Sequence, residues 1–532
     1  IGTIGRPRTL TGEWSRPEGE RLLDPDDAAN ILGEALAAHG LREEVEKLEG
    51  VFEQWLERTD DTHMLSRVRA PFLDPFALPE LERDITNEAR GITSDLLPTI
   101  RKMIQNNLDL NEPNVMIALQ KFLYTAHPYE GDLISYAKDA DARLESGLGA
   151  LEGDREFALR GLELLRVPRR TFYIGGDRAK SHISVINASQ GVAFENLLLG
   201  TIDEFNDLLA RLDRPIEVPD LVLPMEPPAE LDGAVTGRIL ASDGRAGRAI
   251  VIGSTDNNTY DMSKIAMVID PGGNDTYTNS DLAIGNRLII DLAGNDRYTG
   301  NANQAVGGAL LGSFIIDDRA GDDRYEGEML GPASALYGLS ILIDRAGNDI
   351  YSGKEWSLGA ACYGAALLID LGGSDVYIGE YLCQGVGGPR GFGAIIDASG
   401  NDLYRTNGPQ PSAYGTPAVY QSFSQGMGFG FRNYAAGGVG LISDLAGNDR
   451  YEAGEFAQGG AYYFALGILH DASGDDLYYG NRYGQGFGVH QAHGALADDA
   501  GNDTYWSMTA ASQGAAWDIG AGLLIDRAGD DT

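Results

Sequence analysis

The chain of 532 residues has little cysteine and little positive charge. Two cysteines cannot build a disulfide framework, and 41 lysines and arginines against 79 acidic residues give a net charge of -38. We therefore expect no nucleic-acid partner, because binding to phosphate backbones needs a basic face. The sequence also lacks an apolar run of the roughly 20 residues that a membrane helix needs, so we expect no transmembrane segment.

Glycine is abundant but unevenly placed. Of the 71 glycines, 19 lie in residues 1–240 and 52 follow them, whereas only two lysines, Lys264 and Lys354, follow residue 240. The composition changes after the proline-rich stretch from Pro215 to Pro228, which is typical of an extended linker. The sequence thus predicts a helical domain over residues 1–214, a linker over 215–233 and a repetitive domain over 234–532.

The first part carries the periodicity of amphipathic helices. Asp24 and Pro25 form an N-cap signal, and apolar residues then recur at helical spacing up to Gly40. Similar stripes predict helices over 45–56, 96–108, 115–124 and 194–212. We expect an all-α domain of about six to eight helices without the residue spacing of a metal site or a nucleophile.

The second part repeats one unit: apolar-apolar-Asp-x-x-Gly-(Asn/Asp/Ser)-Asp-x-Tyr. Examples are IDLAGNDRY ending at Tyr298, IDRAGNDIY ending at Tyr351 and IDASGNDLY ending at Tyr404. From Tyr298 the motif tyrosines step by 27, 26, 26, 27, 47, 27 and 27 residues. Periods of 20–50 residues indicate a solenoid, a propeller or an array, and a propeller blade needs about 40–45 residues.

A period near 26 with short strands and glycine corners predicts a parallel β-solenoid (β-helix) of about ten coils with a 26–27 residue period. Equivalent positions then stack about 4.8 Å apart. The Ile and Leu residues before the Asp fill the core, and Cys362 and Cys383 are interpreted as small core residues. A recurring Gln-Gly, at Gln384, Gln458 and Gln485, predicts an amide ladder that satisfies itself along the axis.

The 47-residue step contains an insertion. It is rich in proline over 406–420, with extra residues up to position 434. Because proline cannot donate to a central ladder, we expect this segment to leave the core as a surface excursion that can be deleted without loss of the fold. Gln425 belongs to this coil and is predicted to be displaced from the other glutamines.

Each complete repeat carries two carboxylates at fixed positions, which stacking arranges in two columns. The first-Asp column contains Asp270, Asp291, Asp318, Asp344, Asp370, Asp397, Asp444, Asp471, Asp498 and Asp526. The second-Asp column contains Asp275, Asp296, Asp323, Asp349, Asp375, Asp402, Asp449, Asp476, Asp503 and Asp531. Two like charges 5 Å apart repel by about 3 kcal/mol at an effective dielectric of 20, so the columns need compensation.

Two kinds of compensation are expected. Six arginines lie close enough in sequence to neutralise some sites: Arg297, Arg319, Arg324, Arg345, Arg450 and Arg527. Copies such as those at Asp370 and Asp471 have no basic residue in the motif, so we expect bound cations to neutralise them. Carboxylate and carbonyl oxygens without histidine favour Ca²⁺. The alternative is that metal-free Asx-turns alone account for Asp, Asn and Gly at these positions.

The motif copies GGNDTY at 272–277 and LAGNDRY at 292–298 resemble the RTX, or haemolysin-type, calcium-binding nonapeptide, with core G-G-x-G-(N/D)-D-x-apolar. The resemblance implies a parallel β-roll with Ca²⁺ between stacked turns, secretion, and the second-Asp column as ligands. An Asp replaces the family's first Gly, and the period is 26 or 27 in place of 9 or 18. The resemblance therefore covers about eight residues of each unit.

The sequence also leads to expectations about the location and the assembly of the protein. High acidity, few lysines and little cysteine suit a secreted, extracellular or cell-surface protein. The chain stops at Thr532 in the middle of a repeat, so we expect the solenoid to continue, in this chain or by contact with another subunit. The helical domain is expected to cap one end.

Two functions remain open. The leading hypothesis is non-enzymatic: a calcium-binding structural or adhesive repeat protein that forms a homo-oligomer, a filament or a lattice. The alternative is a β-helix polysaccharide lyase or hydrolase. An irregular patch makes carbohydrate a candidate partner; it contains His470, Tyr478, Tyr479, Tyr483, His490 and His493. Strand alternation places His490 and His493 on opposite faces and weakens a two-His metal site.

Overall fold

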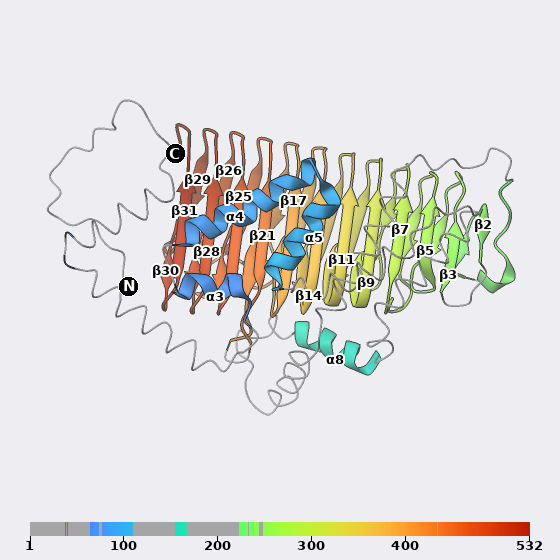
Figure 1. Cartoon of the computed structure of the whole chain (residues 1–532), viewed down its shortest axis with the longest axis horizontal. Helices are drawn as coiled ribbons and strands as arrows, with labels where there is room; N and C mark the ends of the chain where they lie inside the picture. The colour runs from blue at the N-terminus through green and yellow to red at the C-terminus, as the bar shows by residue number, and fades with distance from the viewer. Residues whose placement is uncertain are drawn as a thin grey trace, which may run out of the picture.

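The structure is a computed structural model that describes residues 38, 40, 64–73, 77–109, 155–166, 223–231, 233–243, 248–432 and 435–532. A few helices precede a parallel β-solenoid of about 9 turns with a period of ~27 residues (Figure 1). The predicted fold class is confirmed, with about nine coils in place of about ten. The three predicted domain limits stay a prediction.

Each coil contributes strands to ladders that run along the solenoid axis. The first ladder joins the apolar strands β3 (Ala249–Ile252), β5 (Ile265–Asp270), β7 (Arg287–Asp291), β9 (Gly308–Asp318), β11 (Ser334–Asp344), β14 (Gly364–Asp370), β17 (Gly391–Asp397), β21 (Val439–Asp444), β25 (Leu466–Asp471), β28 (His493–Asp498) and β31 (Ala521–Asp526). The second joins the tyrosine strands β1 (Val235–Thr236), β4 (Thr259–Asp261), β6 (Thr276–Thr278), β8 (Arg297–Tyr298), β10 (Arg324–Met329), β12 (Ile350–Ser357), β15 (Val376–Cys383), β18 (Leu403–Thr406), β22 (Arg450–Glu452), β26 (Leu477–Gly480) and β29 (Thr504–Ser507).

A third ladder of short strands continues from the start of β11. It joins β13 (Ala360–Cys362), β16 (Val386–Gly387), β20 (Met427–Phe429), β24 (Ala461–Tyr462), β27 (Gly488–Val489) and β30 (Ala516–Trp517). A separate pair, β19 (Gln421–Ser424) with β23 (Glu455–Ala457), completes the corner beside it.

Stacking keeps equivalent positions in register. Asp344 pairs with Asp370, and the tyrosines of neighbouring coils pair in the same way. The strands of the first ladder are buried on both faces except for half-buried β31 at the last edge, as parallel sheets usually are, which explains their continuous apolar runs. In β11, Leu342 packs with the stacked tyrosines inside the solenoid, whereas Ile341 and Ile343 belong to the core that also contains the helices.

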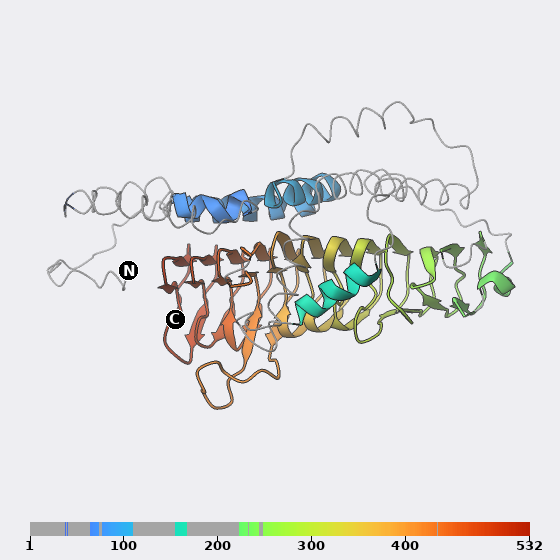
Figure 2. The same ribbon diagram turned by 90° about the horizontal axis from the view of Figure 1, so that it is seen from below.

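The helices pack along the side of the solenoid. Helices α3 (Ser66–Leu73), α4 (Leu78–Arg90) and α5 (Leu96–Asn107) lie across the first ladder, and α8 (Arg155–Leu165) lies along its flank (Figures 1 and 2). A 3-10 turn, η2 (Gly91–Thr93), joins α4 to α5, and η3 (Ala229–Leu231) precedes the strands. The Trp356 indole N–H donates to the Leu165 carbonyl of α8 at 2.9 Å.

The predicted helix over 96–108 is confirmed by α5, in which Pro98 occupies the first turn. Apart from residues 38 and 40, the predicted helices over 24–40, 45–56, 115–124 and 194–212 lie outside the described residues. Within the described ranges, no helix has the length and apolar character needed to span a membrane.

In the described part of the chain, strands cover the first edge of the solenoid, and the capping role expected of the helical domain stays a prediction. Strand β1 pairs antiparallel with β4, and β2 (Ala241–Ser242) pairs antiparallel with β3. The described helices lie along the side of the solenoid (Figure 2). An antiparallel strand reverses the chain direction at the edge and so interrupts the parallel stacking there.

A polar cluster fixes α4 to the last coils. Glu82, fully buried in the middle of the apolar face of α4, accepts a 2.7 Å bond from Arg527. Arg527 also pairs with Asp499 at 2.6 Å, and Arg90 of α4 reaches the same Asp499. His470 lies 3.3 Å from Asp499 and 2.9 Å from Ser443. The cluster supplies the specific contacts in an otherwise apolar interface.

The inserted segment leaves the solenoid between β18 and β19, as expected (Figure 2). It is tied back by an antiparallel bridge between Pro411 and Tyr420. Glu455, which is fully buried, accepts bonds from Ser412 Oγ at 2.6 Å and Ala413 N at 3.0 Å. Deleting the segment would therefore leave a buried carboxylate without these donors, a cost that the sequence does not reveal.

The glutamines do not form the predicted amide ladder. Gln384 Nε2 donates to the carbonyls of Tyr377 at 2.8 Å and Arg405 at 3.2 Å, which belong to successive coils. Gln458 and Gln485 repeat this bridge, and Gln425 lies in the same column, so its predicted displacement is wrong. The side chains bond to backbone because each glutamine has a left-handed backbone, with φ of 65° at Gln384.

Replacing Glu82 by alanine should release α4 from the solenoid. Loss of one partner of a buried ion pair costs about 3 kcal/mol, so protection of α4 amides against hydrogen exchange should fall about 100-fold. Hydrogen exchange read by mass spectrometry measures this. The control is Arg297→Met, which breaks an exposed pair with Glu326 and should change protection little. Unchanged protection in the Glu82 variant would contradict the docking role.

Candidate metal centre

The first-Asp column ends the strands of the first ladder and is fully hydrogen-bonded. Asp344 Oδ1 accepts the N–H of Ala346 at 3.2 Å, which closes an Asx-turn. Its Oδ2 accepts the hydroxyl of Tyr325, from the preceding coil, at 2.7 Å. The same two bonds recur at Asp291 and Asp370. Both oxygens of these carboxylates are therefore occupied by protein donors.

The tyrosines form a stacked column inside the solenoid. The rings of Tyr325 and Tyr351 lie 4.9 Å apart at an interplanar angle of 8°, and the following pairs repeat this arrangement. Burial, and then the charges of Asp344 and Asp370, raise the pKa of Tyr351 well above its ordinary value. The hydroxyl therefore stays protonated and acts as a donor to the first-Asp column.

The second-Asp column is only half satisfied. Asp349 Oδ1 accepts the backbone N–H of Asp323, from the preceding coil, at 2.6 Å. Asp349 is 1% exposed, and its Oδ2 is buried and has no hydrogen-bond partner among the described residues. The same unpartnered oxygen recurs along the column, at Asp275, Asp296, Asp323, Asp375, Asp402, Asp449, Asp476 and Asp503. Buried polar atoms are normally paired, so a whole row of exceptions calls for a ligand.

The motif glycine makes this geometry possible. A Cβ atom at Gly347 would lie 2.7 Å from both carboxylate oxygens of Asp349 and 1.8 Å from the carbonyl oxygen of Gly321. The carboxylate folds back over its own turn, and only glycine leaves it room. This close approach explains why the motif always has glycine two residues before the second Asp.

The residue before the second Asp has a structural role that sequence reasoning missed. The side chain of Asn295 accepts the N–H of Asp322 at 3.2 Å, and Asp322 accepts the N–H of Asn348 at 2.9 Å. The position is exposed and needs only an acceptor, which explains why Asn, Asp and Ser alternate there. The sequence signal for this role was the restriction of the position to Asn, Asp and Ser, whose short side chains all accept a hydrogen bond.

Stacking brings the two columns together as predicted. Carboxylate oxygens of Asp323, Asp344 and Asp349 all lie within 4.8 Å of one another. Further groups form at Asp270/Asp275/Asp291, Asp296/Asp318/Asp323, Asp349/Asp370/Asp375 and Asp375/Asp397/Asp402, and four more recur. Each site thus lies between two coils and draws on both columns.

Ionised carboxylates are unfavourable inside these groups. Burial raises the pKa of Asp323 to about 9, helped by the charge of Asp318. Burial likewise raises the pKa of Asp349 to about 7 and that of Asp375 to about 9. The folded state must therefore bind protons or cations in this row at neutral pH.

The predicted arginine partners are wrong where the structure shows their bonds. Arg297 pairs with Glu326, Arg450 with Glu452, and both Arg319 and Arg345 with Asp317, which is next to the first-Asp column but outside it. Arg527 binds Glu82 and Asp499. These side chains lie on outer faces, whereas the columns lie inside the coil. Arg324 is exposed on β10.

The irregular patch separates into three places. His470 joins the cluster beneath α4, His490 lies at a surface cavity, and His493 is buried against Phe72 of α3 with ring centroids 4.2 Å apart. Burial lowers the pKa of His493 to about 3. His490 and His493 therefore lie in different surroundings, one at the cavity and one against α3. Cys362 and Cys383 are free and buried, as expected of small core residues.

Neither a family model, nor a curated protein, nor a solved structure matches this chain. The parallel solenoid with its Asp groups is consistent with an RTX-like repeat. The chemistry of the site therefore has to be inferred from its own residues.

The raised pKa values predict an unusual pH dependence without divalent cations. Each second-column carboxyl from Asp275 to Asp503 has an ordinary pKa near 3.9 when unfolded and a higher one when folded. Its contribution to stability is complete below about pH 4 and is lost as the pH rises towards the folded values of about 7 to 9.

In chelator at constant ionic strength, the melting temperature should therefore be higher at pH 5 than at pH 8. Circular dichroism melts measure it. A melting temperature that rises with pH in chelator would contradict the raised pKa values.

Proposed function

We propose that this chain is an exported calcium-binding structural or adhesive repeat protein. The observation that carries the proposal is the row of buried second-Asp oxygens without hydrogen-bond partners. Second-Asp residues such as Asp323, Asp349 and Asp375 belong to groups of three carboxylates whose oxygens lie within 4.8 Å of one another, close enough for one cation to contact all three. The cation would neutralise the row and join each coil to the next.

The donor set favours Ca²⁺. Calcium binds oxygens at 2.3–2.6 Å, so two oxygens bound to one ion lie at most about 5 Å apart, and the oxygens of each group, all within 4.8 Å of one another, meet that condition. The donors are carboxylate oxygens, which suit a hard cation. The resemblance of the turn motif to RTX repeats supports the same ion. When bound, Ca²⁺ supplies positive charge and coordination, with no reaction step.

Metal-free Asx-turns explain only part of the motif. They account for the first-Asp column, where Asp344 caps its own turn, and side-chain acceptors account for the Asn position. They leave the second oxygen of Asp349 without a role. The calcium proposal explains this oxygen and the raised pKa values together.

A structural or adhesive role suits the regularity of the solenoid. Strong acidity and the near absence of lysine and cysteine in the repeats support export, a cell-surface location and assembly into a filament or lattice, which form part of this proposal. A polysaccharide lyase or hydrolase remains the alternative prediction. Sedimentation of the intact protein with and without calcium tests assembly.

Calcium should raise the stability of the solenoid strongly. A ligand at 100 times its Kd adds about 2.7 kcal/mol per independent site, so the melting temperature at pH 7.5 should rise by many degrees over that in chelator. Circular dichroism and metal analysis after dialysis measure stability and stoichiometry. An unchanged melting temperature and no retained calcium would overturn the proposal.

The Asp349→Asn variant separates the ligand role from general damage. It keeps the acceptor for the Asp323 N–H but removes the charge of the unpartnered oxygen, so calcium stoichiometry should fall by one or two ions. The matched control is Asp322→Asn, the same exchange at an exposed position that needs only an acceptor. Equal stoichiometry in the two variants would contradict the assignment of ligands.

A further inference from the structure

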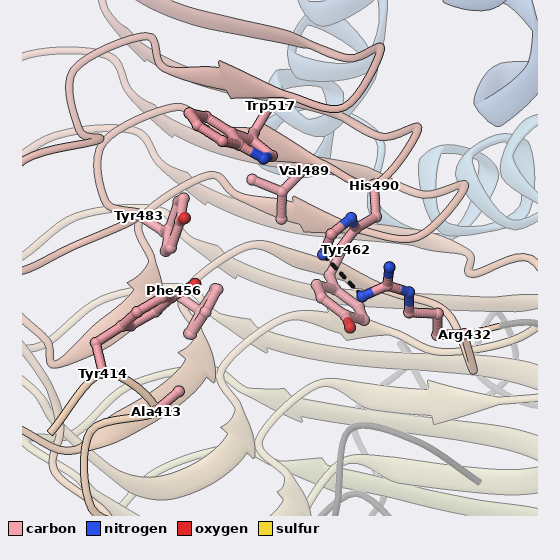
Figure 3. Close-up of a pocket in the computed structure, with 9 residues that line it drawn as sticks. All are labelled: Ala413, Tyr414, Arg432, Phe456, Tyr462, Tyr483, Val489, His490 and Trp517. Carbon is pink, nitrogen blue, oxygen red and sulfur yellow. Dashed lines mark hydrogen bonds between the residues drawn. The ribbon is translucent and has the colours of Figure 1, made fainter. Parts of the chain in front are cut away.

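A cavity of about 250 Å³ opens where the repeat is broken by the insertion. One of its walls belongs to the third ladder, in which Phe429, Tyr462, Val489 and Trp517 occupy one stacked row. Val489 is the small member between two large aromatic ones, and Figure 3 shows it between Tyr462 and Trp517. The missing ring at this position leaves a gap in the row.

The gap has the dimensions of one ring. Tyr462 and Trp517 are two rungs apart, which corresponds to about 10 Å along the axis. A ring placed between two aromatic faces needs about 7–8 Å, since carbon atoms in contact lie 3.5–4.0 Å apart. The His490 ring packs edge-on against Tyr462 with centroids 5.2 Å apart and occupies part of this space, so a ligand ring would lie over Val489 on the side of Trp517.

The opposite wall is aromatic and rigid. Phe423, Phe456 and Tyr483 stack with centroids 4.3 and 4.9 Å apart. The insertion adds Tyr414, whose ring lies 5.6 Å from that of Tyr483 and carries the guanidinium of Arg482 at 4.3 Å. The bonds from Ser412 and Ala413 to buried Glu455 hold this part of the insertion in place.

One edge of the cavity is polar and fixed in orientation. Asp518 Oδ2 accepts a 2.6 Å bond from His490 Nδ1, which leaves Nε2 as an acceptor for Arg432 Nη1 at 3.1 Å (Figure 3). Burial and the charge of Arg432 lower the pKa of His490, so the neutral ring required by this chain of bonds is present at pH 7. A guanidinium has five N–H donors, and this bond sets its plane at the cavity.

The composition of the walls selects a class of ligand. Arg432 at the edge opposes a cationic group, and the net charge of -38 opposes a nucleic acid. Aromatic faces with hydrogen-bond donors at the edge suit a ring that has apolar faces and a hydroxyl-bearing perimeter. A pyranose has both features.

We propose that this cavity binds the pyranose ring of a saccharide, stacked between Tyr483 and Trp517 and hydrogen-bonded by Arg432. The site deepens the adhesive role proposed above, because it gives that role a ligand. It differs from a general aromatic ladder in two ways: the row is interrupted at Val489, and the insertion supplies a wall.

An array of neutral and uronate oligosaccharides tests the site, with the whole chain in calcium. We expect binding to at least one pyranose series. Val489→Phe, which refills the row from within, and Tyr483→Ala should each weaken that binding about tenfold or more, in line with the loss of one stacked aromatic contact and its packing. The control is Trp506→Ala, an exposed aromatic that stacks on Tyr479 outside the cavity.

Melting in calcium confirms that each variant is folded, so a failure of the calcium proposal would appear in the melts and a failure of the sugar site in the array. Absence of binding across the array would overturn the inference. So would equal binding by the Val489→Phe variant and the wild type. Shortened saccharides after incubation would also overturn it, since the cavity would then be a catalytic site.

Discussion

The structure depends on one constraint: carboxylates of like charge stack from coil to coil inside the solenoid. Two carboxylates per coil lie within the wall of the coil, next to the same pair in the next coil. The tyrosine hydroxyls, the Asx-turns and the backbone N–H groups each stabilise one oxygen of a pair. One oxygen per coil is left without a partner in the described part of the chain, and its charge is the repulsion that the stacked fold still has to offset at neutral pH.

On the outer face of the first ladder, arginine side chains neutralise the acidic residues. Asp317 takes the position of an outward isoleucine and is held between Arg319 and Arg345, whereas Glu82 of α4 is matched by Arg527. Arginine side chains reach these acids because the outer face is open to the long side chains of neighbouring turns. The interior turn is closed by glycine and has room only for small partners.

The sequence was sufficient to predict what repeats. The tyrosine steps set the coil length, the Asp positions set the two columns, and the inserted prolines placed the excursion, because stacking converts sequence period directly into neighbours in space. The sequence did not predict which groups the side chains contact. Gln384 turns to backbone carbonyls because its own backbone is left-handed, and the second oxygen of Asp349 is isolated by the fold of its turn. The pairing of Glu82 with Arg527, 445 positions apart, breaks no period and leaves no trace in the repeat.

The hydrogen bonds of the turn give the solenoid a direction. Along the second-Asp column, the N–H of each coil donates forward to the carboxylate of the next coil, as from Asp323 to Asp349. Along the neighbouring Asn position the bond runs the other way, from the N–H of Asn348 back to Asp322. The two faces of a coil are therefore complementary but unlike. Within the chain, each coil therefore follows the one before it in a single orientation, in which the donors of one face meet the acceptors of the other.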